Sequence, residues 1–316
     1  MGLSRLKSVA VSLLAKGSVR RRFRALLASL CGAGLLCVAS ACGPTQTPPS
    51  ANVPEGPTIA IAVPNDEPGL SLDHEGKYSG FDVEVAHYVA QKLGYAQKQI
   101  VFKPVTVSSA VATLEQSKAD MFVSALPAAT ASSAGRQFGT SKPYLTNPLG
   151  LMVPTRLQRE FTDISSLQDR SICTVKGTVD GSELTSAVPF IKIQERETYP
   201  QCLTALLSGE ANAVAADVAI LHGLASSVVE RDVTVLGDGD SASSASSASL
   251  ANAVARISQV PHAIMIRPSD GELTKKIDAI LSGMAKDGTW CKAADTMRKD
   301  IGYSPEESLN AAMMRR

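Results

Sequence analysis

The stretch Gly76–Gly94, GKYSGFDVEVAHYVAQKLG, constrains the fold of this chain more than any other segment. Its opening glycines allow the backbone to turn after an extended run. Asp82 then suits a helix N-cap, and Glu84 places negative charge in the first turn, where the helix dipole favours it. The apolar positions recur on one helical face at Val85, Val89 and Leu93. Gly94 follows as a stop signal, so the stretch predicts a turn and then a helix with one buried face.

The N-terminus has the layout of an export signal. Basic residues gather in the first 24 positions, and Ala25–Ala41 carries no charge. This apolar run is short for a membrane span and ends in small residues directly before Cys42. The ending resembles a lipobox, so we predict a lipoprotein signal peptide over residues 1–41 and lipidation of Cys42. The alternatives are an uncleaved anchor, or ordinary cleavage that leaves a free Cys42 thiol; the arginines at Arg20–Arg22 also leave a twin-arginine route open.

A tether is expected after the signal. Residues 42–57 continue from Cys42 as GPTQTPPSANVPEGP, which is rich in proline and poor in large apolar side chains. Such a segment is extended and without a core of its own. One lipidated cysteine suits attachment to a membrane surface rather than spanning. We therefore predict an extracytoplasmic protein that a lipid anchors to the cell membrane.

The composition of the body excludes several function classes. The chain has a formal net charge of +1 and 4% aromatic residues, with Trp290 as its single tryptophan. A near-neutral body without a basic patch gives no reason to expect nucleic acid. A sugar site built on stacked indoles is not expected either. The histidines lie far apart without metal-ligand spacing, so we interpret all of them as structural or exposed and predict no metal and no cofactor: His74, His87, His222 and His262.

A weak internal repeat indicates two similar lobes. Without gaps, Leu114–Ala125 aligns with Leu206–Asp217, and each reads as a helix end, a polar turn and a buried strand. Such units build parallel α/β sheets, in which ligands collect outside the carboxyl ends of strands. The cleft between two lobes is therefore the expected site. Further strands are expected at Thr58–Val63, Gln99–Val107, Ser171–Val175, Val233–Leu236 and His262–Ile266.

The chain resembles a family at several ordered landmarks. The motif G-x-Y-x-G-F-D-V-E-V-A within Gly76–Gly94 looks like the opening of the extracellular solute-binding proteins of the amino-acid type, which serve ABC importers. Asp66–Leu70 (DEPGL) resembles a glutamate-binding branch, and Lys142–Tyr144 (KPY) resembles the element before the first crossover between lobes. Ser171–Thr178 resembles the strand and G-T turn that open the second lobe, and Leu273–Lys292 resembles the C-terminal helix with its D-G-T-W ending.

The resemblance implies a two-lobed periplasmic-binding-protein fold of type II. Each lobe is then an α/β unit with a mixed sheet flanked by helices, and the ligand cleft lies between the lobes. We expect lobe 1 at residues 58–145, lobe 2 at 146–260, and a return to lobe 1 with C-terminal helices at 261–316. Residues 238–253, which are rich in serine and alanine, are expected to form a flexible loop within lobe 2 that affects closure or is a tolerated surface insertion.

The resemblance also implies a disulfide between Cys173 and Cys202. In the branch that this chain resembles, cysteines at these two places are bonded, and an exported protein lies in an oxidising setting. The alternative is a pair of buried thiols. Cys291 falls outside this pair and is expected to be a small core residue rather than a reactive one.

The same resemblance implies a ligand set for a zwitterion. Gly177 and Thr178 match the G-T turn, whose amides and hydroxyl would hold a carboxylate. Asp217 matches the aspartate that takes the ammonium. The alternatives are a helix N-cap for Thr178, and a cap on the helix expected at Val218–Leu224 for Asp217.

The first lobe departs from the family pattern. The family has hydroxyl residues after the strand and then an arginine, whereas this chain has alanine and proline at positions 125 and 127. Arg136 is the remaining cation nearby, either as the carboxylate clamp or as a surface arginine. Ser124 and Thr130 are weaker candidates for ligand contacts, with turn positions as the alternative. These departures are expected to weaken both affinity and closure.

The sequence thus predicts the substrate-binding lipoprotein of an ABC transporter. It would capture a polar amino acid, similar to glutamate or glutamine, and act as a monomer with a membrane permease as its partner. A ligand-sensing lipoprotein that signals to a membrane partner is one alternative, and a degenerate scaffold with a lost amino-acid site is another. Dehydratases occur on this fold, but no acid/base pair with convincing spacing is apparent, so we do not expect an enzyme.

Overall fold

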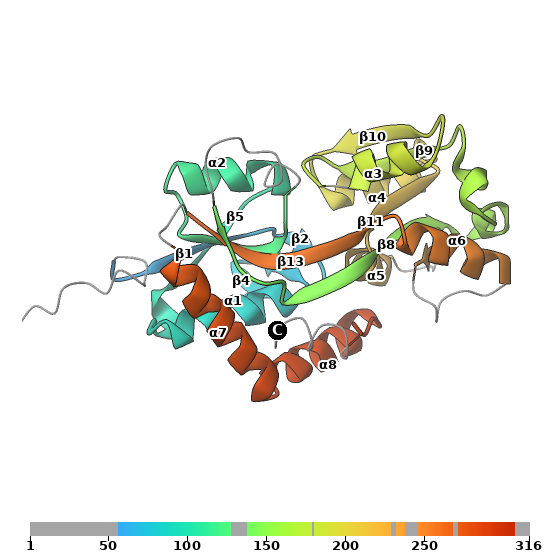
Figure 1. The fold of residues 1–316 in the computed structure, drawn as a ribbon. Coiled ribbons are helices and arrows are strands. Elements are labelled where there is room, and N and C mark those ends of the chain that lie inside the picture. Colours follow the sequence, from blue (N-terminus) through green and yellow to red (C-terminus); the bar gives the residue numbers. More distant parts are fainter. Residues whose placement is uncertain are drawn as a thin grey trace, which may run out of the picture. The chain divides into compact units, whose positions relative to one another are not determined.

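The protein is an α/β structure with one large sheet and one small sheet (Figure 1). This computed structural model describes residues 56–127, 138–178, 180–228, 232–237, 245–267 and 271–306, all of which lie in the compact unit formed by residues 47–316. The strands are β1 (Ile59–Val63), β2 (Asp66–Glu67), β3 (Ser71–His74), β4 (Lys77–Ser79), β5 (Ile100–Pro104), β6 (Met121–Ala125), β7 (Gly139–Thr140), β8 (Leu145–Pro154), β9 (Ser171–Val175), β10 (Lys192–Arg196), β11 (Ala213–Asp217), β12 (Val233–Leu236) and β13 (Gln259–Ile266). The helices are α1 (Phe81–Lys92), α2 (Ala110–Glu115), α3 (Asp180–Ala187), α4 (Tyr199–Leu207), α5 (Val218–Ser226), α6 (Ala245–Ala255), α7 (Glu272–Lys286) and α8 (Thr289–Ile301).

The large sheet joins two groups of strands. Its order among the described residues is β10-β9-β11-β8-β13-β6-β1-β5, with β12 paired to β8 and β7 paired to β13. We call the elements β1 to β7, α1 and α2 lobe 1, and the elements β9 to β12 and α3 to α6 lobe 2. The long strands β8 and β13 run antiparallel to each other between the two lobes (Figure 1). The two-lobed α/β fold that the sequence predicted is therefore confirmed.

The internal repeat corresponds to a real structural repeat. The ungapped alignment places Met121 on Ala213 and Ala125 on Asp217, which are the two ends of β6 and of β11. In lobe 1, β6 pairs parallel with β1 and antiparallel with β13. In lobe 2, β11 pairs parallel with β9 and antiparallel with β8. The strands expected from the sequence are all present.

The expected lobe boundaries fall within the linking strands. Position 145 is the first residue of β8, and position 261 lies inside β13. Strand β8 pairs with β11 and β12 of lobe 2, β13 pairs with β6 and β7 of lobe 1, and the two strands pair with each other, so the sheet has no break that marks a boundary. The boundaries at these two positions stay a prediction.

Helix α1 begins two residues earlier than the sequence suggested. Its N-cap is Gly80, with φ of 119°, and not Asp82. A Cβ at Gly80 would collide with the backbone carbonyl of Leu70, so only glycine fits there. Asp82 instead lies inside the helix and is completely buried. The predicted stop is confirmed, since Gly94 has φ of 107° directly after the C-cap at Leu93.

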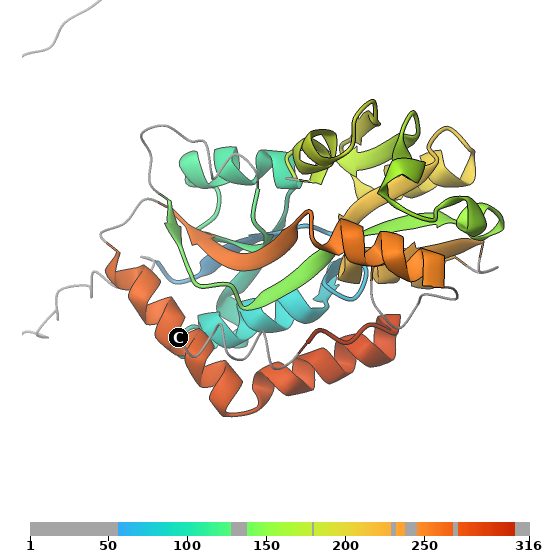
Figure 2. The same ribbon diagram turned by 45° about the vertical axis from the view of Figure 1, so that its right-hand side comes forward.

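The C-terminal helices pack on α1. The buried side chains of α7 recur every three or four positions, at Leu273, Ile277, Leu281 and Met284. Gly288, in the left-handed conformation, ends this run and begins α8. Figures 1 and 2 show α7 and α8 following each other on the side of α1. Helix α8 also contacts α5, so it touches both lobes.

The loop predicted for residues 238–253 is wrong over its second half. Residues Ala245–Ala255 form helix α6, while 238–244 lie outside the described residues. Alanine favours a helix, and the buried side chains Leu250 and Val254 lie one turn apart on the side that faces the lobe 2 core. The sequence did not predict this helix because only a few large apolar residues occur in the segment.

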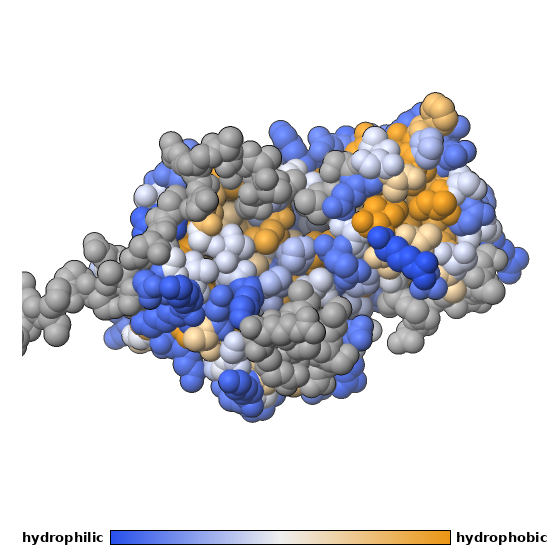
Figure 3. Space-filling view, in the orientation of Figure 1, coloured by the Kyte–Doolittle hydropathy of each residue, from blue (hydrophilic) through white to orange (hydrophobic). Residues whose placement is uncertain are grey.

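The surface of the described residues carries few large apolar side chains. Those that are exposed are Val101, Phe190 and Leu207. Figure 3 shows hydrophilic residues over much of the visible face and apolar ones gathered over lobe 2, at the right of the view. Within the described part of the chain, no helix is both long and apolar enough to cross a membrane.

Candidate functional site

A small cavity lies between the two lobes. Its lining comes from lobe 1 and lobe 2, with residues Pro64, Asn65, Asp66, Glu67, Thr106, Val107, Val175, Glu197, Thr198 and Tyr199. Its volume of about 20 Å³ is room for about one water molecule. At this point the described residues of the two lobes leave too little space for a solute of amino-acid size.

Close contacts between the lobes account for this small volume. A Cβ placed on Gly177 of lobe 2 would lie 2.8 Å from the Cα of Ser108 in lobe 1. The Ser108 hydroxyl donates to Glu197 Oε2 at 3.3 Å, and Lys176 pairs with the other oxygen of Glu197 at 3.3 Å. On α5, Gly223 lies against the backbone carbonyl of Pro68, again with no space for a Cβ. Two glycines therefore allow the lobes to meet backbone to backbone.

The G-T turn lies beside this contact. Gly177 has φ of 88°, a conformation that favours glycine. The Thr178 hydroxyl donates to the backbone carbonyl of Val175 at 2.7 Å, and the Thr178 amide points to the same carbonyl at 3.2 Å. These bonds form a turn directly after β9. A ligand role for Gly177 and Thr178 stays a prediction.

Asp217 is buried at the end of β11, with 1% of its surface exposed. Its carboxylate caps α5 by accepting from the amides of Ala219 at 2.6 Å and Ile220 at 3.4 Å. It also accepts from Asn147 Nδ2, at 3.2 and 3.0 Å from its two oxygens. The capping alternative is therefore observed. Its binding of a ligand ammonium stays a prediction, and in this closed arrangement its oxygens are already engaged.

The remaining contact of Asp217 is one that the sequence did not reveal. His262 on β13 is completely buried and lies with Nε2 3.0 Å from Asp217 Oδ2. Its other nitrogen, Nδ1, lies 3.2 Å from Asp82 Oδ2 and 3.3 Å from Asp82 Oδ1. One imidazole thus connects α1 of lobe 1 with the end of β11 in lobe 2. The interpretation of His262 as structural or exposed agrees with its burial, but missed its two carboxylate partners.

Other polar groups extend this network. Tyr144 Oη donates to Asp82 Oδ1 at 2.8 Å, and Tyr303 Oη donates to Asn147 Oδ1 at 3.0 Å. Trp290 Nε1 on α8 donates to the carbonyl of Tyr144 at 2.7 Å. Hydrogen bonding compensates for the burial of these groups, because an unpartnered buried polar group would be destabilising.

Burial and neighbouring charges shift the pKa values of this network. Burial lowers the pKa of His262, but the charge of Asp82 and the hydrogen bonds to Asp217 and Asp82 outweigh it and hold that pKa well above 6.5. Burial raises the pKa of Glu67 well above 4.5, and repulsion from Asp66 and Asp82 adds to the rise. The network therefore favours a protonated imidazole beside a neutral Glu67 carboxyl.

The remaining lobe 1 candidates divide between buried and undescribed positions. Ser124 on β6 is completely buried, and its hydroxyl donates to Glu67 Oε2 at 3.4 Å. Thr130 and Arg136 lie outside the described residues, as do Cys42 and the predicted signal and most of the tether. Their roles stay predictions. In the sequence, Asp66 stood out only as part of the DEPGL motif. It lines the cavity, and its Oδ2 has no hydrogen-bond partner among the residues that the structure describes.

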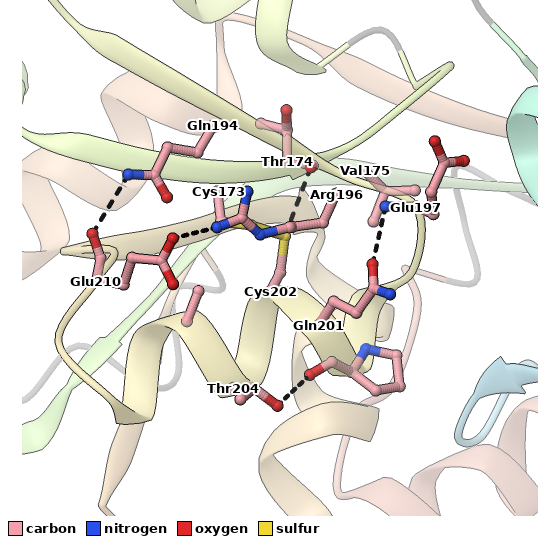
Figure 4. Close-up of a disulfide and its surroundings, with 12 residues drawn as sticks. Cys173, Thr174, Val175, Gln194, Arg196, Glu197, Gln201, Cys202, Thr204 and Glu210 are labelled. Atoms are coloured by element: carbon pink, nitrogen blue, oxygen red, sulfur yellow. Dashed lines mark hydrogen bonds and ion pairs between the residues drawn. A yellow bond between two sulfur atoms is a disulfide. The ribbon is translucent and has the colours of Figure 1, made fainter.

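The disulfide between Cys173 and Cys202 is confirmed. It ties β9 to α4 in the interior of lobe 2, as Figure 4 shows, with both cysteines completely buried. Ion pairing of Arg196 with Glu210 flanks it. Cys291 is half-buried on α8 and packs against the main apolar core. Over the described residues, no three His, Cys, Asp or Glu side chains are grouped as a metal site.

Comparison with known proteins identifies the family. The sequence model described as "Bacterial extracellular solute-binding proteins, family 3" matches residues 59–297. A glutamate-binding protein, GluB of Corynebacterium glutamicum, is 26% identical over 248 residues, which are 75% of this chain and 77% of the relative. The ABC transporter glutamine-binding protein GlnH of Bacillus subtilis is 24% identical over 226 residues, 70% of this chain and 73% of the relative.

A solved structure shows the same fold. The solute receptor for L-cysteine of Neisseria gonorrhoeae superposes with a TM-score of 0.65 and 21% identity, covering 79% of this chain and 95% of the receptor. The family match spans both lobes and the strands that link them. This chain therefore belongs to family 3 of the bacterial extracellular solute-binding proteins.

Proposed function

We propose that this protein is the substrate-binding lipoprotein of an ABC importer and captures a polar amino acid, similar to glutamate or glutamine, in the cleft between its lobes. The observation that carries the proposal is the family match over residues 59–297, which includes both walls of the cleft. The names of GluB and GlnH support the class of solute. Lipidation of Cys42 and the tether over residues 42–57 would keep the body near a membrane permease.

The proposed ligand set combines both lobes. The amides of the Gly177–Thr178 turn and the hydroxyl of Thr178 would hold a carboxylate, with Arg136 as its clamp from lobe 1. The ammonium would pair with Asp217, and Asp66 adds a carboxylate oxygen that no described residue hydrogen-bonds. The solute is bound without covalent change, as its family name implies, and we assign it no catalytic residue.

Capture requires an opening motion. The cavity between the lobes has room for about one water molecule. Entry of a solute here must therefore separate Gly177 from Ser108, and Gly223 of α5 from Pro68. Strands β8 and β13 link the lobes and are the elements about which such a motion would occur. A ligand shifts this equilibrium only through contacts that differ between the two states.

Thermal unfolding with a panel of common amino acids at millimolar concentration tests the proposal, with titration calorimetry for any that shift the midpoint. A ligand at about a hundred times its dissociation constant stabilises the native state by about 2.7 kcal/mol. Arg136→Ala and Asp217→Asn should remove that shift, whereas Arg159→Ala, an exposed arginine of lobe 2, should leave it intact. A shift that survives both site variants would contradict the proposed ligand set.

A second candidate is a scaffold that no longer binds an amino acid. The engagement of Asp217 by Asn147 and His262 and the small volume of the cavity favour it. If no amino acid of the panel shifts the unfolding midpoint, in protein whose disulfide and folded state are verified, that result would support this candidate and exclude the importer proposal.

A further inference from the structure

His262 connects three parts of the molecule that must move relative to one another when the cleft opens. It lies on β13 at the position where this strand pairs with both Ala125 of β6 and Leu145 of β8. Asp82, on α1, belongs to lobe 1, and Asp217, at the end of β11, belongs to lobe 2. Both side chains reach the imidazole within 3.3 Å and are completely or almost completely buried.

The geometry requires a proton beyond the one that a neutral histidine carries. A neutral imidazole has one N–H donor and one nitrogen acceptor, whereas an imidazolium donates from both nitrogens. Here both ring nitrogens face carboxylate oxygens, of Asp82 on one side and of Asp217 on the other. With the extra proton both contacts are charge-assisted hydrogen bonds; without it, one of them brings two acceptors together in a buried site.

The other titratable groups around the ring do not replace this proton. Glu67 on β2 interacts with His262 electrostatically and is itself pushed toward the neutral form by burial. Tyr144, directly before β8, stacks edge-on against the imidazole with ring centroids 6.2 Å apart, and burial also raises its pKa. No described Lys or Arg forms an ion pair with Asp82 or Asp217. His262 is therefore the cation that the described residues place between these two carboxylates.

We propose that protonated His262 is a positioning residue that latches the two lobes in the closed arrangement, and that loss of its proton releases them. The inference rests on the proposed function only in taking the interlobe cleft as the place of ligand entry. Rotation about β8 and β13 would move Asp217 relative to Asp82. The His262 ring can therefore contact both carboxylates at only one separation of the lobes. A deprotonated ring would leave two carboxylates facing each other across it and would favour separation.

The direction of the pH dependence follows from the raised pKa of His262. A histidine whose pKa is higher in the folded, closed state contributes its full stabilisation below its ordinary 6.5, and the contribution is lost as pH rises through the raised value. The latch should therefore hold at neutral pH and release under alkaline conditions.

The protonation state is tested by nitrogen NMR of the purified protein labelled with ¹⁵N-histidine. The signals of His262 are assigned by their loss in His262→Gln, and the exposed His74 serves as the reference histidine. We expect both ring nitrogens of His262 to carry protons at pH 8. A neutral ring of either tautomer at this pH would overturn the proposal.

The latch itself is tested by small-angle X-ray scattering without ligand, from pH 7 to pH 10. The radius of gyration should rise with pH in wild-type protein and in His74→Gln, and should already be raised at pH 7 in His262→Gln. Asp217→Asn removes one charge beside Nε2 while an asparagine can still cap α5, so its transition should move to lower pH. Circular dichroism verifies that each variant remains folded.

Two results of the scattering experiment would overturn the latch. One is a radius of gyration that does not change with pH although NMR shows a titrating His262, since the imidazolium would then be only structural. The other is a transition at the same pH in wild type and Asp217→Asn. Neither readout needs a ligand, so failure of the amino-acid panel and failure of the latch are distinguishable.

Discussion

The disulfide of lobe 2 should contribute a large part of the stability of this protein. Cys173 and Cys202 are 29 positions apart, and their bond closes a loop that contains α3 and β10. We predict that replacing either cysteine by alanine lowers the free energy of unfolding substantially. The loop remains connected through β9 and β10, so the fold of lobe 2 should persist at room temperature.

The magnitude follows from the length of the closed loop. With 29 residues in the loop, the chain-entropy relation gives about 3.5 kcal/mol at 25 °C. For a body of this size, each kcal/mol corresponds to about 2 to 4 °C in the unfolding midpoint. Loss of the bond should therefore lower the midpoint by about 7 to 14 °C.

Differential scanning calorimetry of three variants separates the crosslink from packing. Cys173→Ala, Cys202→Ala and the double variant each break the same bond, so all three should lower the midpoint almost equally. Cys291→Ala, which leaves the disulfide intact, is the control and should have a much smaller effect. Single effects that add up to the double effect would refute the reasoning, because they would show that lost core packing and not loop closure dominates.

Two further predictions follow from the structure. Gly223→Ala should raise the dissociation constant of the ligand at least tenfold, because the new Cβ would collide with the carbonyl of Pro68 when the lobes close. Gly283→Ala, whose Cβ makes only ordinary van der Waals contact, is the control and should leave the dissociation constant unchanged. Calorimetric titration of both variants measures this, and equal affinities would contradict it. Tyr88 Oη donates to Asp287 Oδ2 at 2.7 Å, and hydrogen bonds from Thr289 and Tyr88 hold the pKa of Asp287 at about 2. The stabilisation from a lowered carboxylate pKa is fully present above the ordinary 3.8 and is lost as pH falls through about 2. Asp287→Ala should therefore lower stability by less than about 1 kcal/mol at pH 7, since this carboxylate is exposed, and by much less at pH 2. Urea unfolding at the two pH values checks this, and an equal loss of stability at both would contradict it.

The local parts of the fold were predictable because their signals lie close together in the sequence. Helix α1 and its stop at Gly94 follow from apolar spacing and one glycine. The repeat between Leu114–Ala125 and Leu206–Asp217 correctly predicted that β6 and β11 occupy equivalent positions in the two lobes. A buried strand that follows a helix gives a recognisable pattern of apolar residues. The disulfide followed from the family resemblance rather than from spacing.

The long-range parts were not predictable from local patterns. Asp82 looked like a helix cap because aspartate is favoured at the N-cap position, yet its carboxylate contacts Tyr144 and His262, which are 62 and 180 positions away. Residues 245–253 looked like a loop because serine and alanine dominate, although Leu250 and Val254 suffice to bury one side of α6. Only the folded chain reveals these partners.

Asp217 shows why a matched motif does not by itself define a working site. The resemblance gives the residue type and its place at the end of β11, where an ammonium would be expected. In this chain the same carboxylate already accepts a hydrogen bond from His262, a cation supplied by β13. If a ligand ammonium binds to Asp217, it exchanges one cation for another, so the charge beside this carboxylate stays nearly constant. The net gain from pairing with Asp217 would then be smaller than the gain from a carboxylate that has no cation beside it in the closed, empty protein. Affinity should therefore depend also on the other contacts of the proposed ligand set, from the G-T turn at Gly177 and from Arg136.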